Sequence, residues 1–264
     1  MQTCLFRPNV LHYINTGKER GDTLVYVMAD IHGNSRRFNS ILEQIDLQPE
    51  DTLYVLGDVI DRHGDGVRIL RRLMAMPNAK VLLGNHEYMM LRALNVPYNP
   101  GKTPNLEECR FIWYRNGGDV THRYWKHIRK TLRAEVVAYL HSLPLSYDVS
   151  VGGRSYKLVH AAPVEDFANN TDSKYPDATH FAVWKRWEKE DMPKGKQVVI
   201  FGHTPTKHYR YADPLEVYFG NNCIGIDCGS GFPDQPEDEF APQGRLACLR
   251  LDDMQVFYSK EDIQ

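Results

Sequence analysis

The chain has 264 residues, of which 42% are hydrophobic and 25% charged. This composition is typical of a globular protein, and the length suffices for one α/β domain over residues 1–264. The net charge of −2 provides no strong field to attract nucleic acid or an anionic membrane. No apolar stretch approaches the roughly 20 residues that cross a bilayer, and the first 20 residues lack the pattern of a secretion signal.

The cysteines give a second indication of cellular context. There are five of them, an odd number, and none forms a Cys-x-x-Cys pair: Cys4, Cys109, Cys223, Cys228 and Cys248. Reduced, mostly buried thiols are typical of this pattern. The sequence therefore predicts a cytoplasmic protein with no nucleic-acid or membrane partner.

Five short apolar runs each lead to side chains that can bind a metal. The runs cover residues 24–29, 52–57, 80–84, 156–159 and 197–202, and the side chains that follow them are Asp30, His32, Asp58, Asn85, His160 and His203. Runs of this length rich in Val, Leu, Ile and Tyr predict buried strands. In α/β sheets, ligands bind at the carboxyl ends of the strands. Oxygen and imidazole ligands without thiolate suit Mn, Fe or Zn, and six exceed the need of one ion. The pattern predicts a two-metal hydrolytic centre.

Helical patterns separate the first three strands. Residues 35–45 and 66–75 place apolar side chains on one face, which predicts parallel βαβ units. Residues 92–145 interrupt this alternation, and 107–143 are expected to be helical with many aromatics. We expect a helical insertion that covers the sheet edge or forms a wall of the site. An ordinary helical layer with no role toward substrate is an equal alternative.

The second half of the chain is rich in predicted strands. Residues 145–151 and 155–159 resemble a hairpin around two glycines, and 168–193 should form a loop with a short helix. Later strands are expected at 197–202, 217–219, 223–227, 244–251 and 254–259. Because strand-rich halves flank the insertion, a sandwich of two sheets is favoured over one open sheet. Residues 1–22 are expected to add an edge strand or to be partly loose.

The individual motifs are weak signals when each is taken alone. In extended backbone, Asp30 and His32 would point to the same side and reach one ion. Asp58 has two oxygens and could bridge two ions. Asn85 offers a neutral oxygen, and the adjacent His86 would be free to act as an acid. Each of these residues is common in turns and on surfaces, so the prediction rests on five strand ends in order.

That order resembles a known family. The motifs are Asp-x-His-Gly at 30–33, Gly-Asp-x-x-Asp-Arg at 57–62, Gly-Asn-His-Glu at 84–87, a later histidine, and Gly-His-Thr at 202–204. They are similar to those of the calcineurin-like metallophosphoesterases, in particular the phosphoprotein phosphatase branch, which includes Ser/Thr protein phosphatases and diadenosine tetraphosphate hydrolases. The resemblance implies an α/β sandwich of two mixed sheets, flanked by helices as four αββα layers, with a dimetal site at one rim.

The resemblance also implies roles for individual residues. One metal would be held by Asp30, His32 and Asp58, and the other by Asp58, Asn85, His160 and His203. The remaining roles are those of a general acid (His86), of its orienting carboxylate (Asp61) and of a phosphate-binding guanidinium (Arg62). A second phosphate-binding arginine is placed at Arg186 by the context Trp-Lys-Arg, with Lys185 in reserve.

Two positions depart from the branch pattern. His63 follows the Asp-Arg pair where glycine is usual, and 161–162 are both alanine where one or two glycines are usual. His63 would lie near the phosphate pocket and could alter selectivity. Neither departure removes a ligand.

The implied reaction is in-line attack on phosphorus by a metal-bridging hydroxide, without a phospho-enzyme. The first expectation is a Ser/Thr protein phosphatase, with a phosphoprotein or small phosphate ester as substrate. A dinucleoside tetraphosphate hydrolase shares the same centre but would need stacking aromatics near the site. A catalytically silent binding protein should have lost ligands, and every matched position here is filled. The sequence leaves open the physiological substrate, the native metal pair and the oligomeric state.

Overall fold

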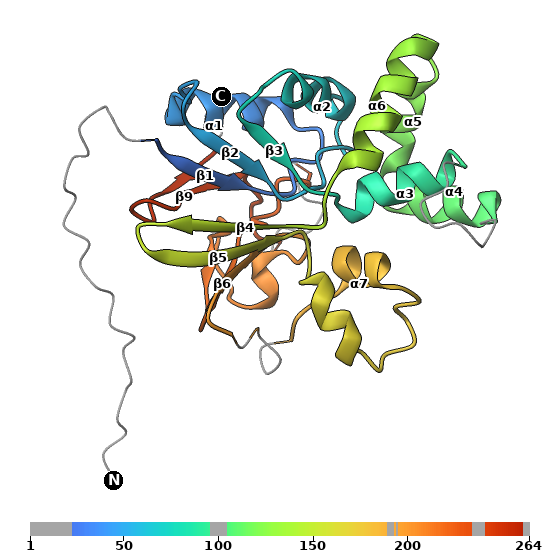
Figure 1. The fold of residues 1–264 in the computed structure, drawn as a ribbon. Helices are drawn as coiled ribbons and strands as arrows, with labels where there is room; N and C mark the ends of the chain where they lie inside the picture. The colour runs from blue at the N-terminus through green and yellow to red at the C-terminus, as the bar shows by residue number, and fades with distance from the viewer. Residues whose placement is uncertain (1–22, 96–104, 189–192, 194, 234–240, 261–264) are drawn as a thin grey trace.

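The structure, a computed structural model, describes residues 23–95, 105–188, 193, 195–233 and 241–260. Two five-stranded mixed sheets pack face to face between helices (Figure 1). The predicted α/β fold of two mixed sheets flanked by helices is therefore confirmed. The edge strand expected within residues 1–22 lies outside the described residues.

The first sheet has the strand order β10-β9-β1-β2-β3. Its strands are β1 (Val25–Met28), β2 (Thr52–Val55), β3 (Ala79–Val81), β9 (Ala247–Arg250) and β10 (Val256–Tyr258). β1, β2 and β3 are parallel, whereas β9 runs antiparallel to β1 and to β10. The carboxyl ends of β1 to β3 therefore meet at one edge.

The second sheet has the order β4-β5-β6-β8-β7. Its strands are β4 (Ser146–Val151), β5 (Arg154–Val159), β6 (Val198–Phe201), β7 (Tyr218–Phe219) and β8 (Cys223–Gly225). β5, β6 and β8 are parallel, and β4 and β7 pair antiparallel at the two edges. The predicted hairpin is β4–β5, and each later predicted strand is present in shortened form.

Side-chain alternation along the strands builds three apolar layers. In β1, Tyr26 and Met28 face the helices, whereas Val27 faces the second sheet. In β6, Ile200 faces the first sheet and Phe201 faces outward. A strand with both faces buried needs the continuous apolar run that the sequence shows. The apolar layer between the sheets packs the parallel strands of one sheet against those of the other.

Helices cover the outer faces. α1 (Ser35–Ile45) and α2 (Gly66–Met74) lie over the first sheet, as predicted from their apolar faces. The Asn34 side chain accepts a hydrogen bond from the backbone N–H of Arg37 (3.1 Å) and so caps α1. A 3₁₀ helix (Val164–Asn169) and α7 (Ala178–Trp184) lie against the second sheet.

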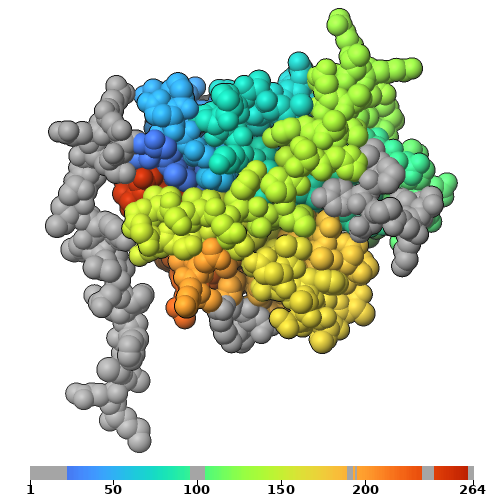
Figure 2. Space-filling model, in the orientation of Figure 1, coloured from blue at the N-terminus to red at the C-terminus, as the bar shows by residue number. Residues whose placement is uncertain are grey.

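The predicted insertion contains helices. After α3 (Asn85–Ala93) come α4 (Leu106–Arg115), α5 (Gly118–Trp125) and α6 (Lys130–Ser142). Figure 2 shows this segment and the one around α7 as neighbouring lobes on one side of the molecule. No helix among the described residues is long and apolar enough to span a membrane. The four described cysteines are buried and free.

Candidate metal centre

The six predicted ligands gather where parallel strands of both sheets end. Two follow β1, one follows β2, one begins α3 beyond β3, and one each follows β5 and β6. All are almost completely buried: Asp30, His32, Asp58, Asn85, His160 and His203. The sandwich therefore brings together side chains that are up to 173 positions apart, since the backbone N–H of His203 lies 3.0 and 3.1 Å from the carboxylate oxygens of Asp30.

The backbone at these strand ends is strained. Six non-glycine residues of the loops have φ between 51° and 72°: Asp30, His32, Asp58, Asp61, Arg62 and His203. L-residues rarely adopt this region, and such outliers cluster at functional sites. The expectation that Asp30 and His32 act from extended backbone is wrong. β1 ends at Met28, and a left-handed turn directs both side chains inward.

Asp58 lies at the middle of the cluster. Its Oδ2 is 3.7 Å from His32 Nε2 and 3.8 Å from His86 Nε2, and its Oδ1 is 3.5 Å from His160 Nε2. Two sets of side chains could each hold an ion, and both contain Asp58: one with His32 and His86, the other with His160 and His203. This arrangement would let one carboxylate offer an oxygen to each of two metals.

Asp30 and His86 are placed differently from the implied ligand sets. Asp30 Oδ1 lies 3.9 Å from His32 Nε2. Asp30 is therefore next to the set formed by His32, Asp58 and His86 but is not a member of it. His86 is a member of that set. Its other nitrogen is engaged by Asp61, an arrangement that suits either a ligand or an acid.

The donor atoms of His160 and Asn85 fit a cation between them. His160 Nδ1 lies 2.7 Å from the Leu56 carbonyl oxygen and must donate to it. The neutral ring then has a lone pair on Nε2, which faces the Asn85 Oδ1, another acceptor, at 2.9 Å. Two acceptors at this distance repel unless a cation, or a proton, lies nearby. Burial lowers the pKa of His160 and so disfavours the proton.

His203 completes the second set. Its Nδ1 is 2.9 Å from the same Asn85 oxygen. Its Nε2 is buried and finds no hydrogen-bond partner among the described residues. Burial also holds the pKa values of His203 and His32 well below the ordinary range, so these imidazoles are neutral, as ligation requires. The donors present fit two divalent cations.

Charge in the cluster points the same way. Burial, with the neighbouring Asp227 and Asp58, raises the pKa of Asp30 well above its usual value. Burial alone would raise the pKa of Asp58. The imidazoles around this carboxylate, His160 first, outweigh burial, so the pKa of Asp58 is lowered. Buried carboxylates so close together are costly without a compensating cation.

His86 is held by a carboxylate that the insertion supports. Asp61 Oδ2 lies 2.7 Å from His86 Nδ1 and accepts a hydrogen bond from Trp113 Nε1, also at 2.7 Å. The Asp61 backbone N–H donates to Thr121 Oγ1 at 3.0 Å. A side chain at Gly118 would clash with the Trp113 indole, so this glycine leaves room for the ring. The insertion therefore contacts Asp61 through Trp113 and Thr121.

The Nε2 atom of His86 lies 3.8 Å from Asp58 Oδ2. Burial alone would lower the pKa of His86, but Asp58 and then Asp61 outweigh it and the pKa is raised. Arg62 NH2 lies 3.4 Å from the same nitrogen. The ring is thus oriented by one nitrogen and can hold a proton on the other.

The Glu87 carboxylate holds the backbone of the loop after β2. It accepts hydrogen bonds from the backbone N–H groups of 58, 59 and 84 at 2.9, 2.9 and 3.1 Å. Burial and the nearby Asp58 raise its pKa to about 7. Sequence reasoning gave Glu87 no role beyond its motif, yet it fixes the backbone that presents Asp58.

The candidate phosphate-binding residues lie at the rim. Arg62 is exposed, and its backbone N–H donates to the Gly117 carbonyl at 3.0 Å. Arg186 is exposed just after α7, close enough for its charge to lower the pKa of His203 and of Asp227. Lys185 instead places Nζ 5.6 Å from the centre of the Trp187 ring.

Asp227 was missed as a member of this region. The sequence predicted only a core strand and turn there, but Asp227 follows β8 and is buried beside the cluster. Burial raises its pKa to about 6, against the opposing effects of the Gly229 N–H and Arg62. Its position two residues beyond an apolar parallel strand was the available signal.

His63 stands where the phosphatase branch usually has glycine. Its Nδ1 lies 3.1 Å from the His32 carbonyl oxygen.

The fold and the site together define a phosphoesterase with a candidate dimetal centre. Residues 23–230 match the family model described as calcineurin-like phosphoesterase. The chain belongs to the calcineurin-like phosphoesterase family.

Several proteins similar to this chain are named symmetrical bis(5'-nucleosyl)-tetraphosphatase. The one from Acidovorax ebreus (strain TPSY) is 29% identical over 139 residues, which cover 52% of this chain and 43% of the relative. The one from Paracidovorax citrulli (strain AAC00-1) is 31% identical over 193 residues, which cover 72% of this chain and 60% of the relative. The matched region thus spans about half the length of these relatives.

A likeness to a solved structure extends over most of the chain. A metallophosphoesterase from Sphaerobacter thermophilus shares the fold with a TM-score of 0.53 at 16% identity, covering 91% of this chain and 88% of that one. This likeness shows the fold alone.

Proposed function

We propose that this protein hydrolyses the phosphate chain of dinucleoside polyphosphates at a two-metal centre. The observation that carries the proposal is the pair of side-chain sets that share Asp58. One set includes His86, an imidazole oriented by Asp61. Two divalent ions, when bound, would supply the charge that activates water and neutralises phosphate oxygens. The similarity to proteins named symmetrical bis(5'-nucleosyl)-tetraphosphatase supports this substrate class.

The side chains divide the remaining work. His86 would give its Nε2 proton to the departing phosphate oxygen, while Asp61 holds the ring and stabilises its protonated form. A positioned acid of this kind typically raises the reaction rate by about 10²–10⁴-fold. Arg62, at the rim and 3.4 Å from His86 Nε2, would bind a non-bridging oxygen of the same phosphate. Arg186 would add a second positive charge.

Phosphoseryl or phosphothreonyl protein, the first expectation from sequence, is kept as a second candidate substrate. Arg62 and Arg186 are exposed at the rim, where a phosphate on a protein surface can reach them. The two substrates differ in the bond that is cleaved: an anhydride in the dinucleotide and an ester in the phosphoprotein. Both require the same metals and the same acid.

A substrate panel decides between the candidates. The purified protein with added Mn²⁺ is assayed with diadenosine tetraphosphate and with a phosphoserine peptide at equal concentration. We expect the larger kcat/KM with the dinucleotide and the loss of both activities with a chelator. Faster hydrolysis of the peptide would contradict the proposed substrate, and chelator-resistant turnover would contradict the dimetal centre.

A further inference from the structure

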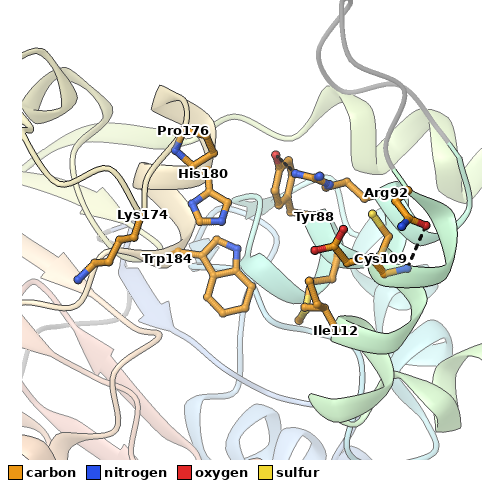
Figure 3. Close-up of a pocket in the computed structure, with 11 residues that line it drawn as sticks. Tyr88, Arg92, Cys109, Ile112, Lys174, Pro176, His180 and Trp184 are labelled. Carbon is orange, nitrogen blue, oxygen red and sulfur yellow. Dashed lines mark hydrogen bonds between the residues drawn. The ribbon is translucent and has the colours of Figure 1, made fainter.

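A cavity of about 260 Å³ opens next to the metal centre, between α3, α4 and α7. Figure 3 shows the rings of His180 and Trp184 on one side and Tyr88, Arg92 and Ile112 on the other. This space lies outside the cluster of metal-binding side chains.

Two elements connect the cavity to the centre. α3 begins with Asn85 and His86 and continues directly to Tyr88, which lines the cavity. Trp184 packs edge-on against the His203 ring, with centroids 5.8 Å apart. A ligand with a phosphate at the metals could therefore place the group attached to it in this cavity.

The walls suit a flat ring. His180 and Trp184 are stacked at 5.9 Å and 21°, and Tyr88 meets His180 edge-on at 6.3 Å. Arg92 lies over the Tyr88 ring at 5.5 Å and donates from NH1 to the Tyr88 hydroxyl at 3.2 Å, which fixes that ring. The volume is below the roughly 300–1,000 Å³ of sites that enclose a drug-sized ligand, so it suits one ring system better than a whole dinucleotide.

One polar atom of the wall lacks a partner. His180 Nδ1 is buried and makes no hydrogen bond to any described residue. Burial lowers the pKa of His180, so the ring is neutral and Nδ1 can donate or accept according to its tautomer. A neutral imidazole presents an aromatic face on which a flat ligand ring can stack.

We infer that this cavity binds a nucleobase of the substrate while the attached phosphate chain lies at the metals. The inference rests on the proposed function and deepens it, because it assigns the residues that would select nucleotides over other phosphates. Stacking on aromatic side chains tolerates different bases, so the site should prefer nucleotides without strong discrimination among bases.

The first test compares substrates with and without a base. In the Mn²⁺-loaded enzyme, the ratio of kcat/KM for diadenosine tetraphosphate to that for p-nitrophenyl phosphate should fall about 10-fold in His180→Ala, since one stacking partner is lost. Ile112→Trp, which fills the cavity instead of opening it, should lower the same ratio. His127→Ala, an exposed histidine of the insertion, is the matched control and should leave both rates unchanged.

The second test measures binding without turnover. Adenosine should raise the melting temperature of the metal-free protein, since ligands of the native state stabilise it, and ribose should not. AMP should inhibit p-nitrophenyl phosphate hydrolysis about 10-fold better than ribose 5-phosphate, and His180→Ala should abolish the difference.

The outcomes separate the two proposals. No preference for AMP over ribose 5-phosphate, or an unaltered substrate ratio in both cavity variants, would overturn the nucleobase site. A preference for AMP with no hydrolysis of diadenosine tetraphosphate would support the nucleobase site and overturn the proposed substrate.

Discussion

The loops after the strands and the helices of the insertion contribute to the same centre in different ways. The loops and the first turn of α3 provide every candidate ligand, each shortly beyond an apolar run. The described insertion helices provide no ligand, but Trp113 and Thr121 hold Asp61, and Gly117 holds the backbone of Arg62. One region thus holds the candidate metal ligands, and the other contacts Asp61, the partner of the proposed acid His86, and the backbone of Arg62, the proposed phosphate-binding residue.

This difference separates two properties, metal binding and proton delivery to the leaving group. Damage to a strand-end loop should remove metal, and with it all activity. Damage to the insertion should leave the metals in place and affect proton delivery, which matters most for poor leaving groups. Metal content and leaving-group dependence are therefore the two measurements that distinguish the regions.

The largest effect is expected at Asp58, the carboxylate common to both ligand sets. Asp58→Asn removes a negative charge from both, so we expect loss of bound metal and a fall in kcat of about 10³-fold or more. Metal content is measured by plasma mass spectrometry on dialysed protein. Asp119→Asn, which alters an exposed ion pair with Arg123 in the insertion, is the control. Retention of two tightly bound ions in Asp58→Asn would refute the bridging role.

The next effect is expected at His86, which lies within one candidate set but is oriented by Asp61. His86→Asn should lower kcat for alkyl phosphates by about 10²–10⁴-fold, with a much smaller loss for p-nitrophenyl phosphate, whose leaving group needs little protonation. Metal content should be unchanged. If metal is lost instead, His86 acts as a ligand, in line with its distance from Asp58.

A smaller effect of the same kind is expected from the insertion. Trp113→Phe keeps the buried ring but removes the N–H that donates to Asp61, so kcat for alkyl phosphates should fall by about 10-fold. The loss should again shrink with p-nitrophenyl phosphate. Trp125→Phe, a buried tryptophan of the same insertion, is the matched control. Equal losses on both substrates would show that Trp113 serves packing only.

The sequence predicted the strand-end region well because its signals are local. An apolar run of four to six residues, followed by Asp, Asn or His, indicates a buried parallel strand and the polar edge beyond it. The two helices between the first strands followed from their apolar faces in the same way. Asp227 has this signal too, two residues after β8, and was passed over because its motif carried no assigned chemistry.

The contacts of the insertion could not be predicted because they are distant in sequence. Trp113 and Thr121 are 52 and 60 positions from Asp61, and no periodicity relates them. The aromatics of this segment were as compatible with ordinary packing as with a site wall. The left-handed turns at Asp30 and His32 were also missed, since non-glycine residues with positive φ depend on tertiary contacts that overcome local preference.

The smallest effect is expected at Arg186, which belongs to neither region and follows α7. It is exposed, so solvent screens its charge, and Arg186→Ala should raise KM for a phosphate substrate by about 5-fold with little change in kcat. The effect should diminish as salt is added. Lys185→Ala is the matched control, because Lys185 lies over the Trp187 ring and should not affect KM. An unchanged KM in Arg186→Ala would leave Arg62 as the phosphate-binding guanidinium at this rim, and the assignment of Arg186 would be wrong.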